Sequence, residues 1–540
     1  MKAADIPSMV RTHLSFERLL FLLFLAALVV RLYHLDLKLF HHDEAVHAWF
    51  SFRLLTEGIY TYNPVYHGPL LYYTTAAIFG IVGATDLVAR VVPAVLGALL
   101  VPLLYPLTRL GYLSSRQTLV AALFIAVSPE MIYFSRFLRN DIFVVFFTLL
   151  LLVALLLYLD REKPGYLMIA AAAAGLGMSS KENMPIVLLI FGAYGVYALW
   201  RGAIRLPAQW RRDSIVAALV TLGIMALFYS SFGQHPEVLM DGWLRAIEHW
   251  TAMHQQERLG GPPYFYLMLL LLYELPIVLL AVFATGQFLA ENPRRGQGYE
   301  WAEGEGWTAR LRHALGIRAG ETGPSEEGIS GIADKNREFT RFCIVWTVAS
   351  LTVYAYLGEK VPWLVLHQLL PLIFVAVYRM TDRKTVVAVL SVVFLAGMTW
   401  HVAFTPADIH EPIVQVQNSE EMREVMALID ASDRVAVITD HYWPLPWYYR
   451  GDAGEKISYL SKNRTIDYLT SQNYDLIIAH DADSFASIPG YHKETYVHSY
   501  WFSTNAQRDR ALEYYIARDG EPGTLNWDVF IDAEHPALSS

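Results

Sequence analysis

Long apolar runs recur along most of this chain, and each has about the length that crosses a lipid bilayer, roughly 20 residues. Only 17% of the residues are charged, whereas soluble domains carry about 25%. The composition excludes a set of soluble domains, and the runs predict a polytopic α-helical membrane protein. No small-residue cleavage site follows the first run, so we expect a membrane anchor there and no signal peptide. The candidate runs cover 19–33, 69–83, 90–108, 117–134, 141–159, 165–178, 184–200, 214–232, 264–290, 339–357, 361–378 and 385–404.

The distribution of arginine and lysine between the runs tests which of them cross the membrane. If every run crossed, the basic loops would divide between the two faces. If the run at 69–83 does not cross, the basic loops all lie on the side of the N-terminus, which the rule assigns to the cytoplasm. That run is short and includes a proline, so we expect a juxtamembrane helix on the outer face. The sequence predicts about eleven transmembrane helices, a cytoplasmic N-terminus and a flexible cytoplasmic loop at 291–338.

The C-terminal region, 405–540, contains no long apolar run and is predicted to be a soluble domain on the outer face. Buried strands at 434–439 and 475–479 and a helix at 420–430 predict a small α/β layer fold. No glycine-rich phosphate loop follows either strand, so a nucleotide site is not supported. The formal charge is -12 over 405–540 and +3 over 1–404. We therefore expect a transmembrane domain at 1–404 and an acidic extracytoplasmic domain at 405–540.

Two adjacent carboxylates, Asp43 and Glu44, follow the first predicted span on the outer side. Ionisable groups at the membrane boundary are costly and usually functional. Such a pair is suited to general-base catalysis or metal binding, and a solvated pair of loop acids is the alternative interpretation. His42 and His47 also lie near Glu44, but their spacing is not that of a helical zinc-protease motif.

Several cations lie in outer loops, where the positive-inside rule does not expect them. Arginine and lysine are suited to binding an anionic phosphate, although arginines that extend toward lipid headgroups are the ordinary alternative. The outer loop at 233–263 adds His249, in a segment whose aromatic residues an interface belt also explains. The remaining outer-loop candidates are His67, Arg136, Arg139, Asp141, Lys181, Glu182, Glu359 and Lys360.

Together these groups predict one outward-facing site of carboxylates and cations. A carboxylate can take the proton of an acceptor hydroxyl, and cations can stabilise a departing phosphate. Because the site lies at the membrane boundary, we expect the phosphate to carry a lipid. The predicted reaction is transfer of a sugar from a polyprenyl- or dolichyl-phosphate donor to a protein, lipid or glycan, in one inverting displacement.

No cofactor is implied with certainty, and a divalent metal ion shared by Asp43 and Asp141 is left open. The net charge of -9 argues against a nucleic acid partner.

The order of these motifs resembles the GT-C superfamily of polytopic glycosyltransferases, of the protein O-mannosyltransferase and aminoarabinose-transferase type. The resemblance covers about residues 15–400 and implies a mannosyltransferase-like enzyme that uses a lipid-phosphate sugar. The matching segments are Asp43-Glu44, Gly68 to Tyr73, Arg90 to Pro93, Ser128-Pro129, Arg136 to Asp141, Lys181, Glu248-His249, Tyr264 to Tyr266 and Lys360 to Pro362.

A closer resemblance is to a prokaryotic, largely archaeal branch identified as flippase-activity-associated. Three segments carry it: His41 to Ala45, Gly358 to Trp363 and Trp443 to Tyr448. Some relatives carry a basic residue just before the juxtamembrane proline, where this chain has His67-Gly68.

The wider family implies roles for individual residues. Asp43 corresponds to the catalytic base, with Glu44 as its neighbour, and Asp141 corresponds to the acidic residue after the third span. Lys181 and Lys360 correspond to the cations that bind the lipid phosphate.

Two other functions fit the same residues. A non-catalytic flippase-associated protein would bind or translocate a lipid-linked saccharide in the same place, but the polar residues lie at the span ends, which favours the enzyme. A membrane scaffold would leave binding to the C-terminal domain, where Trp443 to Arg450 could stack on a sugar or peptide. A buried aromatic cluster is the simpler interpretation of that segment. All three functions imply a multi-pass protein of the plasma membrane.

Overall fold

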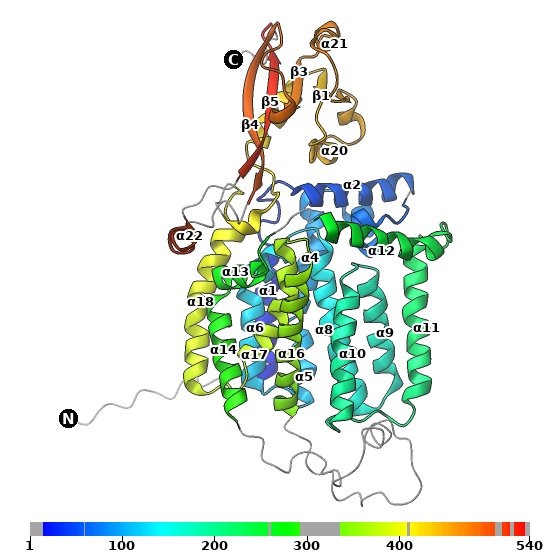
Figure 1. Ribbon diagram of the computed structural model, residues 1–540, viewed down its shortest axis with the longest axis vertical. Coiled ribbons are helices and arrows are strands. Elements are labelled where there is room, and N and C mark those ends of the chain that lie inside the picture. The colour runs from blue at the N-terminus through cyan, green and yellow to red at the C-terminus, as the bar shows by residue number, and fades with distance from the viewer. Residues whose placement is uncertain are drawn as a thin grey trace, which may run out of the picture.

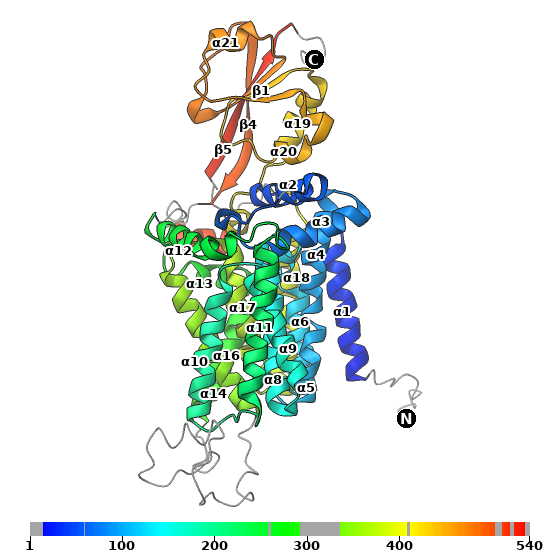
Figure 2. The same cartoon turned by 90° about the vertical axis from the view of Figure 1, so that its right-hand side faces the viewer.

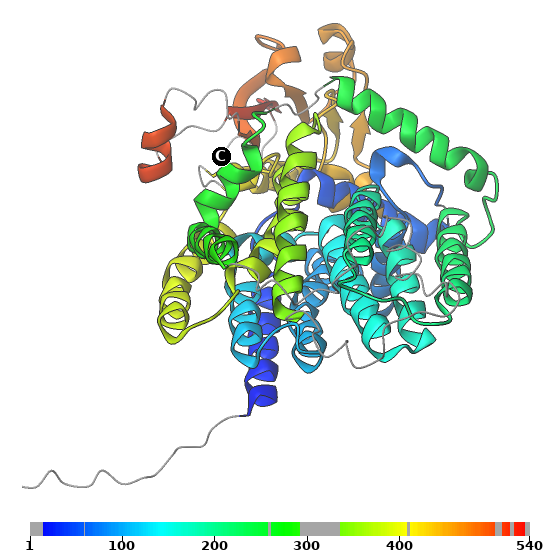
Figure 3. The same ribbon diagram turned by 60° about the horizontal axis from the view of Figure 1, so that its bottom comes forward.

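The computed structural model describes residues 15–58, 60–256, 261–291, 335–407, 411–502, 510–518 and 523–534. Long helices stand side by side in one bundle, and a small β-sheet domain rises from one end of it (Figures 1 and 3). Most of the predicted loop at 291–338 lies outside the described residues. The bundle helices are α1 (Phe16–Leu32), α4 (Asp86–Leu99), α6 (Ser115–Val127), α8 (Asn140–Arg161), α9 (Pro164–Met178), α10 (Met184–Trp200), α11 (Trp210–Tyr229), α14 (Leu275–Ala290), α16 (Lys335–Tyr356), α17 (Leu366–Ala376) and α18 (Asp382–Ala403).

The bundle has the composition of a membrane-spanning body. Within the described residues, five helices are long and apolar enough to cross a membrane, or up to seven if each of two bent helix pairs is one span. Other bundle helices are apolar but shorter, such as α9 with 15 residues and α10 with 17. The expected multi-pass helical architecture is therefore confirmed, while the number of about eleven spans stays a prediction.

The two bent pairs each break at a proline. Helix α6 meets α7 (Pro129–Ser135) at 56°, and α13 (Phe265–Tyr273) meets α14 at 109°. Proline lacks a backbone N–H and is tolerated best in the first turn of a helix, where that donor would have no partner. Pro129 begins α7, and the hydroxyl of Ser128 accepts a hydrogen bond from the N–H of Met131 at 3.1 Å.

Three helices lie at the end of the bundle that carries the sheet domain. Helices α2 (His42–Glu57) and α12 (Val238–Gln256) run across that end, roughly perpendicular to the long helices (Figures 1 and 2). Helix α3 (Leu70–Val82) has 13 residues and packs against α2. The segment predicted as a juxtamembrane helix thus forms a short helix beside α2.

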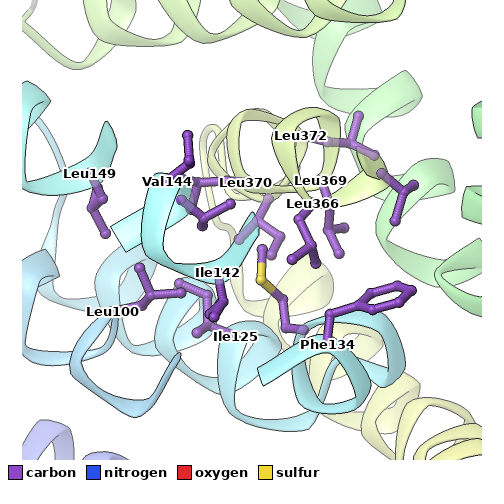
Figure 4. Close-up of a cluster of buried hydrophobic side chains, with 14 of the residues drawn as sticks. Leu100, Ile125, Phe134, Ile142, Val144, Leu149, Leu366, Leu369, Leu370 and Leu372 are labelled. Atoms are coloured by element: carbon purple, nitrogen blue, oxygen red, sulfur yellow. The ribbon is translucent and has the colours of Figure 1, made fainter. Parts of the chain in front are cut away.

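Helix α17 is the central helix of the bundle. Every residue from Leu366 to Ala376 is buried, as expected for a helix that is apolar on all sides and surrounded by others. Figure 4 shows Leu366, Leu369 and Leu370 of α17 beside Ile142 of α8 and Ile125 of α6. Packing around α17 fixes the start of α8, which carries the predicted site residue Asp141 and directly follows Arg139.

The C-terminal domain contains a five-stranded mixed sheet in the order β2-β1-β3-β5-β4. Strands β1 and β2 and strands β1 and β3 pair in parallel, whereas β5 pairs antiparallel with both β3 and β4. The predicted strands at 434–439 and 475–479 contain β1 and most of β3, and the predicted helix at 420–430 corresponds to α19 (Met422–Ala431). The boundary between residues 404 and 405 stays a prediction. The strands are β1 (Val435–Val437), β2 (Ile457–Tyr459), β3 (Leu476–His480), β4 (Tyr491–Trp501) and β5 (Gly523–Asp532), and the further helices are α20 (Leu445–Tyr448), α21 (Ile466–Ser471) and α22 (Ala511–Ala517).

Candidate active site

A cavity of about 310 Å³ lies between α2, α12 and the adjoining ends of α8, α10 and α16. It therefore lies at the end of the bundle that faces the sheet domain (Figure 2). Seven of the residues predicted for the site line this cavity: Asp43, His67, Arg139, Lys181, Glu182, His249 and Glu359. The other predicted residues, Glu44, Arg136, Asp141 and Lys360, are not among its lining residues.

Asp43 reaches the cavity from the first turn of α2. His41 caps this helix, because its Nδ1 accepts a hydrogen bond from the N–H of Asp43 at 3.0 Å. The Glu44 carboxylate accepts in turn from the N–H of His41 at 3.1 Å, which completes a capping box. His47 follows Asp43 by one helical turn and lines the same cavity.

The partner of Asp43 is Arg139, the residue that precedes α8. Its Nη1 donates to Oδ2 of Asp43, and its guanidinium lies 3.7 Å from the ring centroid of Trp363. Burial by itself would raise the pKa of Asp43, but the charge of Arg139 and the nearby histidines outweigh it and hold the pKa below its ordinary value. Asp43 is therefore a carboxylate at physiological pH.

The second ion pair joins Asp141 and Lys181. The Lys181 Nζ lies 2.9 Å and 2.8 Å from the two carboxylate oxygens of Asp141. Asp141 is almost fully buried, and it also lies 3.5 Å from Nε of Arg139 and 3.4 Å from Nε2 of His367. Its position behind both cations means that Asp141 orients Arg139 and Lys181 and does not face the cavity.

Arg136 lies elsewhere than expected. Its guanidinium caps the C-terminal end of α1, where Nη1 donates to the carbonyl of Arg31 at 3.1 Å and Nη2 to the carbonyl of His34 at 2.7 Å. The last carbonyls of a helix have no partner within the helix and carry partial negative charge. Arg136 satisfies these carbonyls, so the prediction that it binds substrate is not supported.

Glu44 and Lys360, which do not line the cavity, also have structural partners. Glu44 is fully buried and accepts from Nη2 and Nε of Arg90 at 2.6 Å and 2.7 Å, and from the N–H of Leu138 at 2.8 Å. Lys360 donates to the carbonyls of Tyr354 and Ala355 at the end of α16, at 3.2 Å and 3.0 Å. Glu44 therefore ties α2 to α4 and to the turn before α8, and its assignment as a catalytic residue is not supported.

Glu182 links two sides of the cavity. Its Oε1 accepts from the hydroxyl of Tyr62 at 3.1 Å, and its Oε2 lies 3.0 Å from Nδ1 of His67. The His67 ring stacks on Trp250 of α12 with the centroids 5.5 Å apart. Burial and the nearby Lys181 charge lower the pKa of His67, and the bond to Glu182 opposes this shift.

Several cavity residues were not predicted from the sequence. Trp250 lies among many apolar and aromatic residues, so no local pattern distinguished it. Trp363 was noted only as the last residue of the Gly358 to Trp363 motif and not as a site residue. Asn183 and Tyr354 line the wall beside Lys181, and an Nδ2 hydrogen of Asn183 donates to the Tyr354 hydroxyl at 3.2 Å. His47 could have been found, because it lies one helical turn after Asp43.

The donor groups at this site do not fit a metal centre. Across the part of the chain that the structure describes, no group of three or more His, Cys, Asp and Glu side chains is placed to hold a metal ion. Asp43 and Asp141, which the sequence suggested could share an ion, both contact the guanidinium of Arg139 instead.

Comparison with known proteins adds a family match over part of the chain. Residues 66–232 match the family described as dolichyl-phosphate-mannose-protein mannosyltransferase. The matched segment contains Arg139, Lys181 and Glu182 of the cavity. The match covers less than a third of the chain. A search of curated protein sequences finds no match.

The fold is similar to that of solved membrane glycosyltransferases. ArnT from Cupriavidus metallidurans bound to undecaprenyl phosphate aligns with a TM-score of 0.57 and 13% identity, over 94% of this chain and 97% of that chain. The apo state of the same protein aligns with a TM-score of 0.55 and 14% identity.

The S. cerevisiae protein O-mannosyltransferase Pmt1-Pmt2 complex bound to the sugar donor is 20% identical to this chain, with a TM-score of 0.35. That alignment covers 42% of this chain and 34% of the yeast chain, so this chain spans about a third of the yeast protein. The closer resemblance to the flippase-activity-associated branch stays a prediction. From the matched segment and the architecture shared with ArnT, the resemblance of this chain to the GT-C superfamily of membrane glycosyltransferases is confirmed.

Proposed function

We propose that this protein transfers a sugar from a polyprenyl- or dolichyl-phosphate donor to a hydroxyl-bearing acceptor. The observation that carries the proposal is that Asp43, Arg139 and Lys181 line one cavity at an end of a membrane-type bundle. A carboxylate and two cations are the groups that such a transfer needs. The family match at 66–232 supports the same class of donor.

Arg139 and Lys181 bind the phosphate of the donor. Each cation is already held by a carboxylate, Arg139 by Asp43 and Lys181 by Asp141. Their positions are therefore set before the donor arrives, and little side-chain motion is lost on binding. As charge develops on the departing phosphate, the two cations stabilise it more than they stabilise the bound donor.

Asp43 takes the proton of the acceptor. The acceptor oxygen forms a bond to the anomeric carbon while the bond from that carbon to the phosphate oxygen breaks. The polyprenyl phosphate leaves with the bonding electron pair, and the acceptor proton passes to the Asp43 carboxylate. One displacement of this kind inverts the anomeric centre. The phosphate is a good leaving group, so no general acid is required.

The lipid part of the donor has an apolar region beside the cavity. A second cavity of about 420 Å³ shares Glu182 and Trp250 with the first. Most of its other lining side chains are apolar or aromatic, among them Met178, Pro185 and Ile247. The ArnT structure with a TM-score of 0.57 holds undecaprenyl phosphate, which supports a polyprenyl carrier here. With the N-terminus in the cytoplasm, the site faces the outer side of the plasma membrane.

The direct test is release of polyprenyl phosphate from radiolabelled undecaprenyl- and dolichyl-phosphate hexoses in membranes that contain the full chain. Asp43→Asn keeps the size of the side chain and removes the base, so we expect at least a hundredfold loss of release. Asp467→Asn changes an exposed carboxylate on α21 and serves as the control. Release at the normal rate by Asp43→Asn would show that Asp43 is not the base. Translocation of the donor by the wild type without release would favour a flippase-associated role instead.

A further inference from the structure

The segment that leads into the Asp43 helix is held by the C-terminal domain. The carbonyl of Leu39 accepts from Nε2 of Gln417 at 2.9 Å, and the carbonyl of Phe40 accepts from Nδ2 of Asn418 at 2.5 Å. The N–H of Phe40 donates to the hydroxyl of Tyr448 at 2.9 Å. Gln417 and Asn418 are buried. Side chains far along the sequence therefore bind consecutive backbone groups just before the site.

His41 extends this contact to the catalytic helix. Its Nε2 lies 2.7 Å from the carbonyl of Gln415, so Nε2 carries the hydrogen and donates. Its Nδ1 then has a free electron pair, which accepts the N–H of Asp43 at 3.0 Å. One imidazole thus joins the C-terminal domain to the first turn of α2.

This arrangement requires a neutral His41. Burial lowers the pKa of His41 to about 4, and the charge of Arg139 acts in the same direction. Asp43, Glu44 and the Gln415 carbonyl act in the opposite direction and are outweighed. Protonation at Nδ1 would remove the acceptor that caps α2, so the burial that residues 415–418 provide also preserves the cap.

A second contact fixes the two domains to each other nearby. Trp447 of α20 is fully buried, and its ring centroid lies 5.3 Å from that of Phe40 and 5.6 Å from that of Phe79. Its Nε1 donates to Oδ1 of Asp86 at 2.7 Å. The aromatic segment at 443–450 thus contributes Trp447 to the junction as part of a buried cluster.

We propose that the C-terminal domain is a working part of the active site, in which Gln417 and Asn418 hold residues 39–41 so that Asp43 faces the cavity. Both are positioning residues, because they act through the backbone of 39–41 and do not line the cavity. The inference rests on the proposed function only for the role of Asp43. According to this proposal, the C-terminal domain contributes to the transfer step by positioning Asp43. It does not need to contact the donor or the acceptor.

The test compares three variants of the full chain in detergent. Asn418→Ala removes the donor to Phe40. His41→Asn keeps a short side chain that can cap α2 but is too short to keep the bond to Gln415. Asn526→Ala is the matched control, because this amide of β5 donates at 3.1 Å to Asp481, an exposed residue of the same domain.

Three measurements separate positioning from folding. Hydrogen exchange of the 38–45 peptide should rise at least tenfold in Asn418→Ala and His41→Asn and stay normal in Asn526→Ala. The Kd for undecaprenyl phosphate should change much less than kcat, because Lys181 keeps Asp141 as its partner and only Arg139 is held by Asp43. The kcat for phosphate release should fall at least tenfold with KM within twofold.

The dependence of the rate of phosphate release on pH, measured below neutrality, provides an independent test. In Asn418→Ala, His41 becomes more exposed, so its pKa should move up from about 4 toward the ordinary value of 6.5. The rate should then fall as pH decreases through this higher pKa.

Normal exchange at 38–45, an unchanged kcat, or a Kd that weakens as much as kcat falls would each overturn the proposal. A wild type that releases no phosphate, together with the expected exchange in the variants, would contradict the proposed function and leave the structural link between 415–418 and 39–41 intact.

Discussion

The carboxylate of Asp141 lies 2.8 Å from the ammonium nitrogen of Lys181, yet of the two only Lys181 lines the cavity. The aspartate therefore faces the lysine from the protein side, and a ligand phosphate would face it from the cavity side. A buried cation needs a partner to offset its loss of hydration. Asp141 supplies that partner, which differs from the catalytic role expected from the sequence.

Asp141→Asn should weaken phosphate binding without removing any group from the cavity wall. Breaking a buried ion pair leaves one charge uncompensated and costs about 3–5 kcal/mol, so Lys181 should shift or lose its proton. We expect the Kd for undecaprenyl phosphate to rise about tenfold or more. A tenfold rise corresponds to a loss of about 1.4 kcal/mol in binding free energy. The measurement is binding of undecaprenyl phosphate to the purified chain.

Asp213→Asn is the matched control for this variant. Asp213 is a buried carboxylate of α11 that accepts from the Tyr158 hydroxyl at 3.0 Å and does not line the cavity. The Asp213→Asn variant should have a lower Tm than the wild type and an unchanged Kd for undecaprenyl phosphate. Equal effects of the two variants on the Kd would show that Asp141 acts only through global stability.

The pH dependence of binding should report Lys181. Burial lowers the pKa of Lys181 below its ordinary 10.5, and the Asp141 charge opposes part of this shift. The ion pair with Asp141 favours the charged form of Lys181, and this cation is lost as pH rises through a value below 10.5. In a titration from about pH 6 to 10, we expect the Kd for undecaprenyl phosphate to increase at alkaline pH, because binding becomes weaker as Lys181 loses its charge.

Lys181→Arg tests the origin of that loss, because a guanidinium stays charged throughout this range. The alkaline weakening should disappear in this variant, even if its affinity at neutral pH is lower. The same alkaline profile in Lys181→Arg and the wild type would assign the titration to another group.

Arg136→Gln should affect stability and not ligand binding. Its guanidinium donates to carbonyls at the end of α1, and glutamine cannot reach all of them. A buried carbonyl left without a partner costs about 1–3 kcal/mol, so the Tm should fall while the Kd for undecaprenyl phosphate stays normal. A large increase in Kd would restore the substrate-binding role expected from the sequence.

Arg116→Gln is a suitable control for the Arg136 variant. Arg116 pairs at 2.6 Å with Asp382 on the surface. Exposed ion pairs contribute about 0–1 kcal/mol, so the Tm of this variant should change little.

The sequence predicted the helical body, two of the five strands and seven of the residues that line the cavity, but not which of two neighbouring arginines faces it. Arg136 directly follows α7, and Arg139 directly precedes α8. The backbone of the turn between these helices directs Arg136 toward α1 and Arg139 toward Asp43. That turn is set by packing of α7 and α8 against other helices, which local periodicity does not contain.

The contributions of the C-terminal domain to the site could not be predicted from the sequence for a similar reason. Gln417 and Asn418 are ordinary polar residues in a short segment, and their partners lie about 380 positions earlier in the chain. Strands β2, β4 and β5 were also missed. Strand β4 mixes partly buried and exposed residues, and its polar side chains weaken the apolar alternation that identifies a strand.

Asp86→Asn should loosen the junction between the two domains. The Asp86 carboxylate accepts from Nε1 of Trp447 and from the hydroxyl of Tyr448, both at 2.7 Å. Hydrogen bonds to a charged group contribute about 1.5–3 kcal/mol each. An asparagine has one acceptor oxygen, so it can keep one of these bonds well and not both. Hydrogen exchange in the peptide covering 443–450 should therefore increase.

Asp430→Asn provides the comparison for this variant. Asp430 accepts from the hydroxyl of Tyr449 at 3.0 Å within the C-terminal domain. It should raise exchange in α19 and leave the peptide covering 79–86 unchanged, whereas Asp86→Asn should raise exchange in both 79–86 and 443–450. Because Tyr448 also binds the N–H of Phe40, Asp86→Asn should extend the change to the segment before Asp43. Exchange confined to the C-terminal domain in both variants would show that Asp86 does not couple the two domains.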